Sequence, residues 1–184
     1  SIIDNLELEP MVTKNTESMG TAFTVSVDAS EDIESGISAK DRSNTVKKLS
    51  DIKSTSDDFV KPGHIFPLRY QKGGVLVRAG HTEGSVDLVK LSGKKPAAVI
   101  CEVMNEDGSM ARGNDLKKIS EKYNIPIVSI EDIIAYRIAN ENLVSKIAEA
   151  KLATKYGEFT IIGFKSEVDN SEPIALIKGN LDKN

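Results

Sequence analysis

The chain has 184 residues, of which 39% are hydrophobic and 28% charged, which is enough to bury one sizeable core and a small additional unit. Its formal net charge of -4 gives no broad cationic surface, so we expect no nucleic-acid partner. One cysteine and two histidines cannot build a thiolate zinc site, and any metal should be one that prefers oxygen ligands, such as magnesium. We find no apolar run long enough for a membrane span, and the acidic opening SIIDNLELEP is unlike a secretory leader, so we expect a cytoplasmic protein without membrane contact.

The first third of the chain combines one strand pattern with one helix pattern. TAFTVSVDA alternates apolar and polar side chains, which predicts a strand over Ala22 to Asp28. Ser38 precedes a helical spacing of apolar residues, with Asp41 three positions later, which predicts a capped helix. Further on, Pro62 and Gly63 predict an irregular loop that carries His64.

The remaining chain alternates strand-like and helix-like segments, which favours an α/β layered domain. In order, we expect a strand VLVRA (75–79), a helix from near Thr82 to Gly93, a strand PAAVICEVM (96–104) covered on both faces, a turn at Asp107 to Ser109, a helix 114–124, a strand PIVSI (126–130) and a helix 131–150. The tail changes character, because two strand-like runs flank a polar turn at residues 169–171.

The start of the helix after VLVRA is a candidate binding site. A helix start offers unpaired backbone N–H groups, so Arg78 before it and Thr82 at its cap could hold a phosphate monoester. His81 lies between them and could bind a metal or transfer a proton. The alternative is that the threonine cap and the histidine are purely structural, as they are in most such turns.

Glu102 is a second candidate because it lies within an apolar run. A carboxylate in a central strand would be costly to bury, and burial would raise its pKa until it could act as an acid or base near neutral pH. The alternative is that the strand lies near an edge and Glu102 faces water. Its neighbour Cys101 is expected to be inert core packing.

Six segments together resemble one family. FTVSVDA, GISAKDR, KPGHIFPL, GGVLVRAGHTEGSVDL, ICEVMNEDGSMAR and VSIEDIIAYR, in this order, are similar to 3,4-dihydroxy-2-butanone 4-phosphate synthases of riboflavin biosynthesis. The resemblance implies a lyase that converts D-ribulose 5-phosphate to L-3,4-dihydroxy-2-butanone 4-phosphate and formate, with Mg²⁺ or Mn²⁺, as a homodimer. It also implies a mixed β-sheet layered between helices, over a domain that we place at residues 1–150.

The resemblance assigns roles to particular positions. His81 matches the metal-binding histidine, and residues 78–82 match the stretch that binds the substrate phosphate, namely Arg78, Ala79, Gly80, His81 and Thr82. His64 and Glu102 match residues regarded as essential for catalysis, and Glu102 also contacts substrate. Ser35 lies where relatives commonly have a threonine that contacts the substrate.

One departure from the family pattern concerns the metal site. An acidic loop of the form DDEDRENEGD, which carries the other metal ligand, does not occur here. We therefore expect an N-terminally truncated synthase domain, which is a fragment, is completed by another chain, or is an inactive sugar-phosphate-binding dimerisation partner.

The tail resembles the junction to a second domain. YGEFTIIGFKSEVDNSEPIALIKGN is similar to the start of a GTP cyclohydrolase II domain in bifunctional riboflavin enzymes, and we assign residues 151–184 to this linker and strand pair. The zinc-binding cysteines of such a domain do not occur, so we expect no cyclohydrolase activity. The alternative is a simple hairpin that packs on the first domain.

Overall fold

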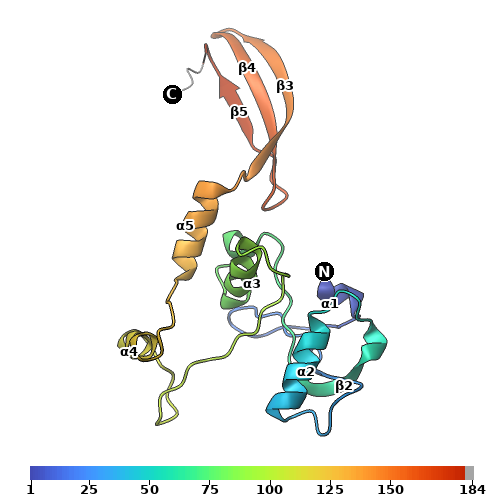
Figure 1. Ribbon diagram of the computed structural model, residues 1–184. Coiled ribbons are helices and arrows are strands. Elements are labelled where there is room, and N and C mark those ends of the chain that lie inside the picture. Colours follow the sequence, from blue (N-terminus) through green and yellow to red (C-terminus); the bar gives the residue numbers. More distant parts are fainter. Residues whose placement is uncertain (181–184) are drawn as a thin grey trace. The chain divides into compact units, whose positions relative to one another are not determined.

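The computed structural model describes residues 1–180 and divides them into two compact units (Figure 1). The first unit comprises residues 1–70 and 81–116, and the second comprises residues 71–80 together with the chain from residue 117 onward. Residues 181–184, the end of the predicted linker and strand pair, lie outside the described residues. The mixture of helices and sheets confirms the predicted α/β class.

The first unit is built on a short antiparallel pair of strands. Its elements are α1 (Ile2–Asn5), β1 (Val27–Ala29), α2 (Ala39–Leu49), a 3₁₀ turn η1 (Ser56–Asp58), β2 (Phe59–Ile65) and α3 (His81–Leu91). β1 pairs with β2 across a bulge, and α2 packs against both strands (Figure 1).

A small apolar core holds this unit together. Leu6, Leu8, Val27 and Phe59 are buried in one cluster, and α1 adds two partly buried isoleucines to it. Full burial of each such side chain contributes about 1.5–3 kcal/mol. The acidic opening of the chain is therefore a structural part of the unit through its leucines and isoleucines.

Helix α2 begins as its sequence predicts. Ser38 is the N-cap, and its hydroxyl accepts a hydrogen bond from the backbone N–H of Asp41 at 3.0 Å. Thr45, fully buried one turn later, donates to the carbonyl of Asp41 and accepts from the backbone N–H of Ala29. The capped helix is thus tied to β1 by a side-chain hydrogen bond.

The structure differs from two predictions, the strand over Ala22 to Asp28 and the irregular loop at His64. A regular ladder covers only Val27–Ala29, and isolated bridges join Phe23 to Leu68 and Thr24 to Pro10. Pro62 and Gly63 lie inside strand β2, so His64 is on a strand and not on an irregular loop. Proline is tolerated there because residues 61–64 fall where the β1–β2 register shifts, and at such a bulge its missing N–H removes no ladder bond.

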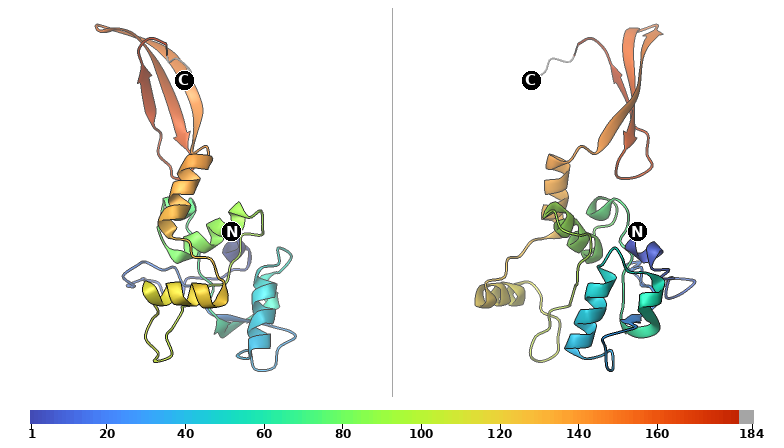
Figure 2. Two further views of the ribbon diagram at one scale, coloured as in Figure 1. Left: turned by 60° about the vertical axis from the view of Figure 1, so that its left-hand side comes forward. Right: turned by 45° about the vertical axis from the view of Figure 1, so that its right-hand side comes forward.

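The second unit contains a three-stranded antiparallel sheet. Its elements are a 3₁₀ turn η2 (Gly74–Leu76), α5 (Ile130–Asn140), β3 (Val144–Thr154), β4 (Gly157–Ser166) and β5 (Ile174–Ile177), and α4 (Asn114–Tyr123) leads into it. The sheet order is β3-β4-β5, with the strands labelled in Figure 1, and Figure 2 draws the same sheet from two further directions. The tail prediction of two strands around a polar turn is confirmed by β4 and β5.

The helix predicted over 131–150 is wrong in its second half. It ends at Asn140, and residues 144–154 form β3, which pairs with β4 along nearly its whole length. Helix propensity is a weak preference per residue, and the hydrogen bonds and side-chain pairs of a long hairpin outweigh it.

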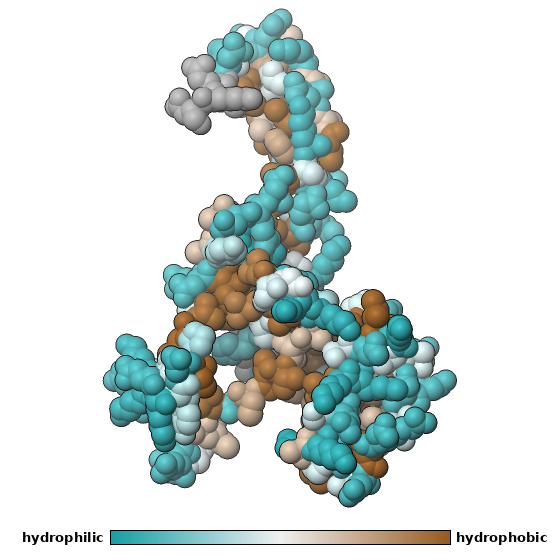
Figure 3. All heavy atoms as spheres, in the orientation of Figure 1, coloured by the Kyte–Doolittle hydropathy of each residue, from teal (hydrophilic) through white to brown (hydrophobic). Residues whose placement is uncertain are grey.

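Three further strand predictions are wrong for a common reason. VLVRA contains the 3₁₀ turn η2, whereas PAAVICEVM and PIVSI have no ladder, apart from one bridge between Met104 and Met110. Within residues 1–180 no other strand pairs with these segments, and an unpaired strand leaves its backbone groups to water. The apolar side chains of PAAVICEVM and PIVSI are consequently mostly exposed, including Val99 at 71% and Ile127 at 57%, whereas Val75 of VLVRA is buried. Apolar atoms are visible on the surface in Figure 3.

Candidate active site

The most specific polar arrangement in the first unit joins β1 to β2. The Nδ1 atom of His64 lies 2.6 Å from Oδ2 of Asp28, and the backbone N–H of His64 donates to Oδ1 of the same carboxylate at 2.9 Å. The Asp28 side chain is only 6% exposed, whereas that of His64 is 40% exposed. A buried carboxylate therefore orients an imidazole that remains accessible to a ligand.

This geometry selects one tautomer of the histidine. An ionised carboxylate can only accept hydrogen bonds, so Nδ1 of His64 carries the proton and donates a hydrogen bond to Asp28. The second ring nitrogen, Nε2, then has a lone pair and can accept a proton from a substrate.

Two glycines make the close packing around this pair possible. Gly36 has φ +81, and a Cβ there would lie 2.2 Å from Oδ2 of Asp28 and 2.6 Å from Nδ1 of His64. At Gly63 a Cβ would lie 2.0 Å from the carbonyl carbon of Val27. Both sites exclude any side chain, because real Cβ atoms do not approach other atoms so closely.

Ser35, the predicted substrate contact, lies on the loop beside this pair. Oδ2 of Asp41 accepts hydrogen bonds from the backbone N–H groups of Ser35 at 3.2 Å and Gly36 at 3.0 Å. Burial raises the pKa of the Asp41 carboxyl, but its hydrogen bonds, including those with Ser35 and Ser38, outweigh this effect and hold the pKa below 3.8. These hydrogen bonds thus fix Ser35 next to Gly36, the residue that packs on His64.

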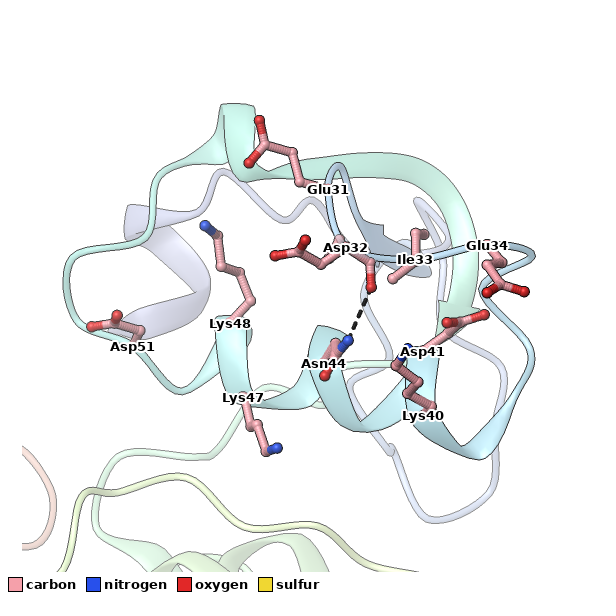
Figure 4. Close-up of a pocket in the computed structure, with 11 residues that line it drawn as sticks. Glu31, Asp32, Ile33, Glu34, Lys40, Asp41, Asn44, Lys47, Lys48 and Asp51 are labelled. Atoms are coloured by element: carbon pink, nitrogen blue, oxygen red, sulfur yellow. Dashed lines mark hydrogen bonds between the residues drawn. The ribbon is translucent and has the colours of Figure 1, made fainter.

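A cavity of about 700 Å³ opens beside the same loop (Figure 4). Acidic side chains of the loop line one side and lysines of α2 line the other, among them Glu31, Asp32, Glu34, Lys40, Lys47 and Lys48. The side-chain amide of Asn44 donates to the carbonyl of Asp32 at 2.9 Å and holds the loop against α2. Figure 4 shows both charge signs facing the opening.

Helix α3 carries two of the predicted site residues at its start. The helix begins at His81, so Thr82 lies within its first turn, whereas the sequence had suggested that Thr82 is the cap. His81 is exposed and Thr82 is 9% exposed, with its carbonyl accepting from the hydroxyl of Ser85 at 2.9 Å. The predicted helix itself is confirmed.

Arg78, Ala79 and Gly80 belong to the segment of residues 71–80, in the second unit. Ala79 is exposed, and Arg78 and Gly80 are half-buried. Gly73, in the same segment, accepts a hydrogen bond from Arg137 of α5 at 2.9 Å through its carbonyl. The side chain of Arg137 also pairs with Glu141 four residues later, and its bond to Gly73 secures α5 to this turn.

The predictions for Glu102 and Cys101 are corrected by their exposure. PAAVICEVM is not a paired strand, so both side chains face water. The alternative reading of Glu102, that it is solvent-facing, therefore describes this structure, and Cys101 is not a core residue. Within residues 1–180 no hydrogen bond or ion pair joins the side chains of His81 or Glu102 to His64.

No metal centre is assembled by the described residues. Among residues 1–180 there is no group of three or more histidine, cysteine, aspartate or glutamate side chains arranged to hold a metal ion. His81 therefore offers one imidazole without carboxylate partners, which is a poor donor set for magnesium.

Two polar residues escaped the sequence reasoning. Asp28 was read only as the end of an alternating strand. Thr24 and Ser26 share its polar face and also bond to the chain near His64. Thr24 donates to the carbonyl of Pro67, and Ser26 accepts from the backbone N–H of Gly63. Asp87 of α3 is only 2% exposed and accepts from the hydroxyl of Tyr70. The sequence carried a signal for both, because each aspartate lies between two apolar residues. An aspartate in such a position is rarely buried without a partner.

Comparison with known proteins identifies the family. Residues 1–136 match 3,4-dihydroxy-2-butanone 4-phosphate synthase, and residues 145–183 match GTP cyclohydrolase II. The chain belongs to the 3,4-dihydroxy-2-butanone 4-phosphate synthase family.

The curated relatives are longer than this chain. The riboflavin biosynthesis protein RibBA of Bacillus cereus is 51% identical over 178 residues, which cover 97% of this chain and 45% of the relative. RibBA of Mycobacteroides abscessus is 48% identical over 180 residues, covering 97% of this chain and 43% of the relative. The chain thus spans less than half the length of these relatives.

Solved structures support the same fold. RibBX of A. baumannii, a two-domain 3,4-dihydroxy-2-butanone 4-phosphate synthase, matches with a TM-score of 0.86 and 40% identity, over 97% of this chain and 52% of that one. The Candida albicans synthase matches with a TM-score of 0.69 and 41% identity, over 73% and 66% of the two chains. A synthase solved with two magnesium ions matches with a TM-score of 0.67 and 35% identity, over 76% and 70%.

No helix among residues 1–180 is both long enough and apolar enough to cross a membrane.

Proposed function

We propose that this chain provides catalytic residues for the conversion of D-ribulose 5-phosphate to L-3,4-dihydroxy-2-butanone 4-phosphate and formate, a lyase step of riboflavin biosynthesis. The observation that carries the proposal is the pair formed by buried Asp28 and accessible His64, whose Nδ1 and Oδ2 atoms lie 2.6 Å apart. An imidazole oriented in this way is suited to repeated proton transfer, which this reaction requires.

The chemistry assigns each residue a task. Enolisation of the ketose needs a base that removes the proton from C3, and Nε2 of His64 or the carboxylate of Glu102 would act in this role. Loss of water from C1, a shift of the carbon skeleton and hydrolytic release of C4 as formate follow, and each needs a proton donor or acceptor near the reacting carbons. General acid–base catalysis of this kind contributes about 10²- to 10⁴-fold.

The phosphate end of the substrate would be held by the residues around the start of α3. We propose that Arg78, Ala79, Gly80 and Thr82 bind the phosphate with side-chain charge and backbone N–H groups, and that Ser35 contacts the sugar. Fixing the anionic end orders the reacting carbons, and a misplacement of about 1 Å costs on the order of 10²-fold in rate.

A divalent ion is implied by the family but does not fit the described residues. Magnesium or manganese would polarise the carbonyl and hydroxyl oxygens of the substrate when bound, and His81 would be this chain's ligand. One imidazole without carboxylates does not make such a site, so further oxygen ligands would have to come from outside residues 1–180.

Formate release tests the proposal. The purified chain is incubated with ribulose 5-phosphate, with and without added magnesium, and formate is followed by proton NMR. We expect formate from the chain and none from heat-denatured chain. Absence of formate under both conditions, with and without metal, would contradict catalysis by this chain.

The second candidate function is a catalytically inactive partner that binds the sugar phosphate and forms dimers. The lack of an assembled metal donor set among residues 1–180 favours it. A chain that is protected from thermal unfolding by ribulose 5-phosphate but releases no formate would support this function, because a ligand that binds only the folded state stabilises it.

The setting of the protein follows from the same proposal. We propose a cytoplasmic homodimer that acts on a small molecule and has no nucleic-acid or membrane partner. We also propose a division near residue 150, with residues 1–150 as the synthase domain and 151–184 as a linker and strand pair at the start of a cyclohydrolase II domain. The match to GTP cyclohydrolase II over 145–183 supports this division.

A further inference from the structure

Helix α3 buries a polar face. Its buried residues are Thr82, Glu83, Gly84 and Asp87, whereas Leu88 and Leu91 are 39% and 42% exposed. Leu88 and Leu91 therefore lie on a more exposed side of the helix than these four residues. Burying carboxylates is costly unless each has a hydrogen-bond partner, so the partners of this face determine how the helix is seated.

Tyr70 contacts this helix at two points. Its hydroxyl donates to Oδ1 of Asp87 at 2.8 Å, and Nζ of Lys90 lies 3.9 Å from the centroid of its ring. Residues 87 and 90 are three apart and so lie on neighbouring positions of one face. Two contacts one turn apart fix both the rotation of the helix and its position along its axis.

Tyr70 is itself anchored to the part of the unit that holds the catalytic pair. The preceding residues 67–69 are joined by backbone hydrogen bonds to the segment that leads into β1, through Pro67 with Thr24 and Arg69 with Ala22. That segment continues to Asp28, and His64 precedes residues 67–69 by three positions. The contacts of Tyr70 thus connect α3 to the Asp28–His64 pair through a short, hydrogen-bonded path.

We propose that Tyr70 and Asp87 are positioning residues that set the start of α3, with His81 and Thr82, relative to the catalytic pair. The inference rests on the proposed function, since it concerns binding of the same phosphorylated sugar. His81 lies six residues before Asp87, which is about 9 Å along the helix axis at 1.5 Å per residue. A stiff helix carries the constraint made at Asp87 to its first turn.

Three substitutions test this role. Tyr70→Phe keeps the ring and its contact with Lys90 but removes the hydroxyl, and it should weaken binding of ribulose 5-phosphate about tenfold. Asp87→Ala should weaken binding at least as much. Asp87→Asn retains an oxygen that accepts from Tyr70 and should restore binding to within about threefold of wild type. Tyr123→Phe, at an exposed tyrosine of α4, is the matched control and should bind as wild type.

Two measurements separate positioning from a general loss of structure. Isothermal titration with ribulose 5-phosphate gives the affinity. Hydrogen exchange followed by mass spectrometry gives the protection, without ligand, of residues 85–88, whose N–H groups bond to the first turn of the helix. In an active preparation the KM of Tyr70→Phe should rise while kcat stays within about twofold of wild type. Exchange in β3 and β4 should not change.

The outcomes are distinct for this inference and for the proposed function. Unchanged affinity and unchanged exchange in Tyr70→Phe would overturn the positioning role, as would an Asp87→Asn variant that binds as poorly as Asp87→Ala. Failure of the wild-type chain to bind ribulose 5-phosphate would contradict the proposed function instead, and exchange at residues 85–88 would still decide whether Tyr70 sets the start of the helix.

Discussion

Asp28 and His64 share two hydrogen bonds, one from the imidazole Nδ1 and one from the backbone N–H of His64, to the two oxygens of a single carboxylate. Because Asp28 is buried and held on both oxygens, it can neither rotate nor exchange partners readily. The ring orientation of His64 is therefore set before any substrate binds, which is the condition for efficient proton transfer.

Asp28→Asn should lower the rate of formate release by about 10²-fold or more. The amide cannot accept at both positions, so one hydrogen bond is lost and the wrong tautomer of His64 becomes favoured. The rate is measured with saturating ribulose 5-phosphate. Asp57→Asn, an exposed change of the same charge, is the control and should retain wild-type activity. Equal rates for both variants would remove Asp28 from the mechanism.

Gly36→Ala should lower the free energy of unfolding by about 1–3 kcal/mol more than Gly108→Ala does. The two glycines have similar positive φ angles, +81 and +84, but a Cβ at residue 36 meets Asp28 and His64 whereas one at residue 108 has no atom within 4 Å. Urea unfolding measures both variants. The control isolates the steric effect, since the backbone strain is shared. Equal losses would show that Asp28 and His64 do not pack against Gly36.

Lowering the pH should destabilise the first unit through Asp41. Hydrogen bonds hold the pKa of its carboxyl below 3.8 in the folded chain, so its stabilising contribution is complete above 3.8 and is lost as the pH falls through the lower, folded value. Urea unfolding at a series of pH values should show a shallower decline below 3.8 for Asp41→Asn than for wild type. Asp57→Asn, which changes the charge equally, should decline as wild type does; a parallel decline for Asp41→Asn would contradict the assignment.

The sequence predicted those elements whose signals are local. The Ser38 cap, the start of α3 and the turn at residues 169–171 depend on neighbours within a few positions, and each is found in the structure. VLVRA, PAAVICEVM and PIVSI have equally clear apolar patterns, but a strand also needs a partner that lies far away in sequence. The apolar character of PAAVICEVM and PIVSI therefore indicated burial, but no strand among residues 1–180 pairs with these two segments and most of their apolar side chains are exposed.

The candidate site likewise contains a residue that local sequence indicated and one that only long-range pairing reveals. His64 was found from its motif, and its proton-transfer role is a proposal that the geometry supports. Asp28 was missed, because only the pairing of β1 with β2 brings it to the imidazole across 36 positions. Glu102 was expected in a buried strand, and its exposure follows from the missing partner of that strand.

Cys101 should react in the folded chain with a thiol reagent such as Ellman's reagent, at a rate close to that of the urea-unfolded chain. The side chain is exposed on a segment without ladder hydrogen bonds, so no opening of the fold is needed before reaction. The release of the coloured thiolate is followed by absorbance. A native rate many times slower than the unfolded rate would indicate that PAAVICEVM is covered, as a buried strand would be.

The most direct test of the central claim is formate release by His64→Ala, measured with and without imidazole in the buffer. We predict loss of formate by about 10²-fold or more in His64→Ala and partial recovery with added imidazole, because the ligand replaces the missing base beside Asp28. A variant that releases formate at the wild-type rate without imidazole would contradict the account.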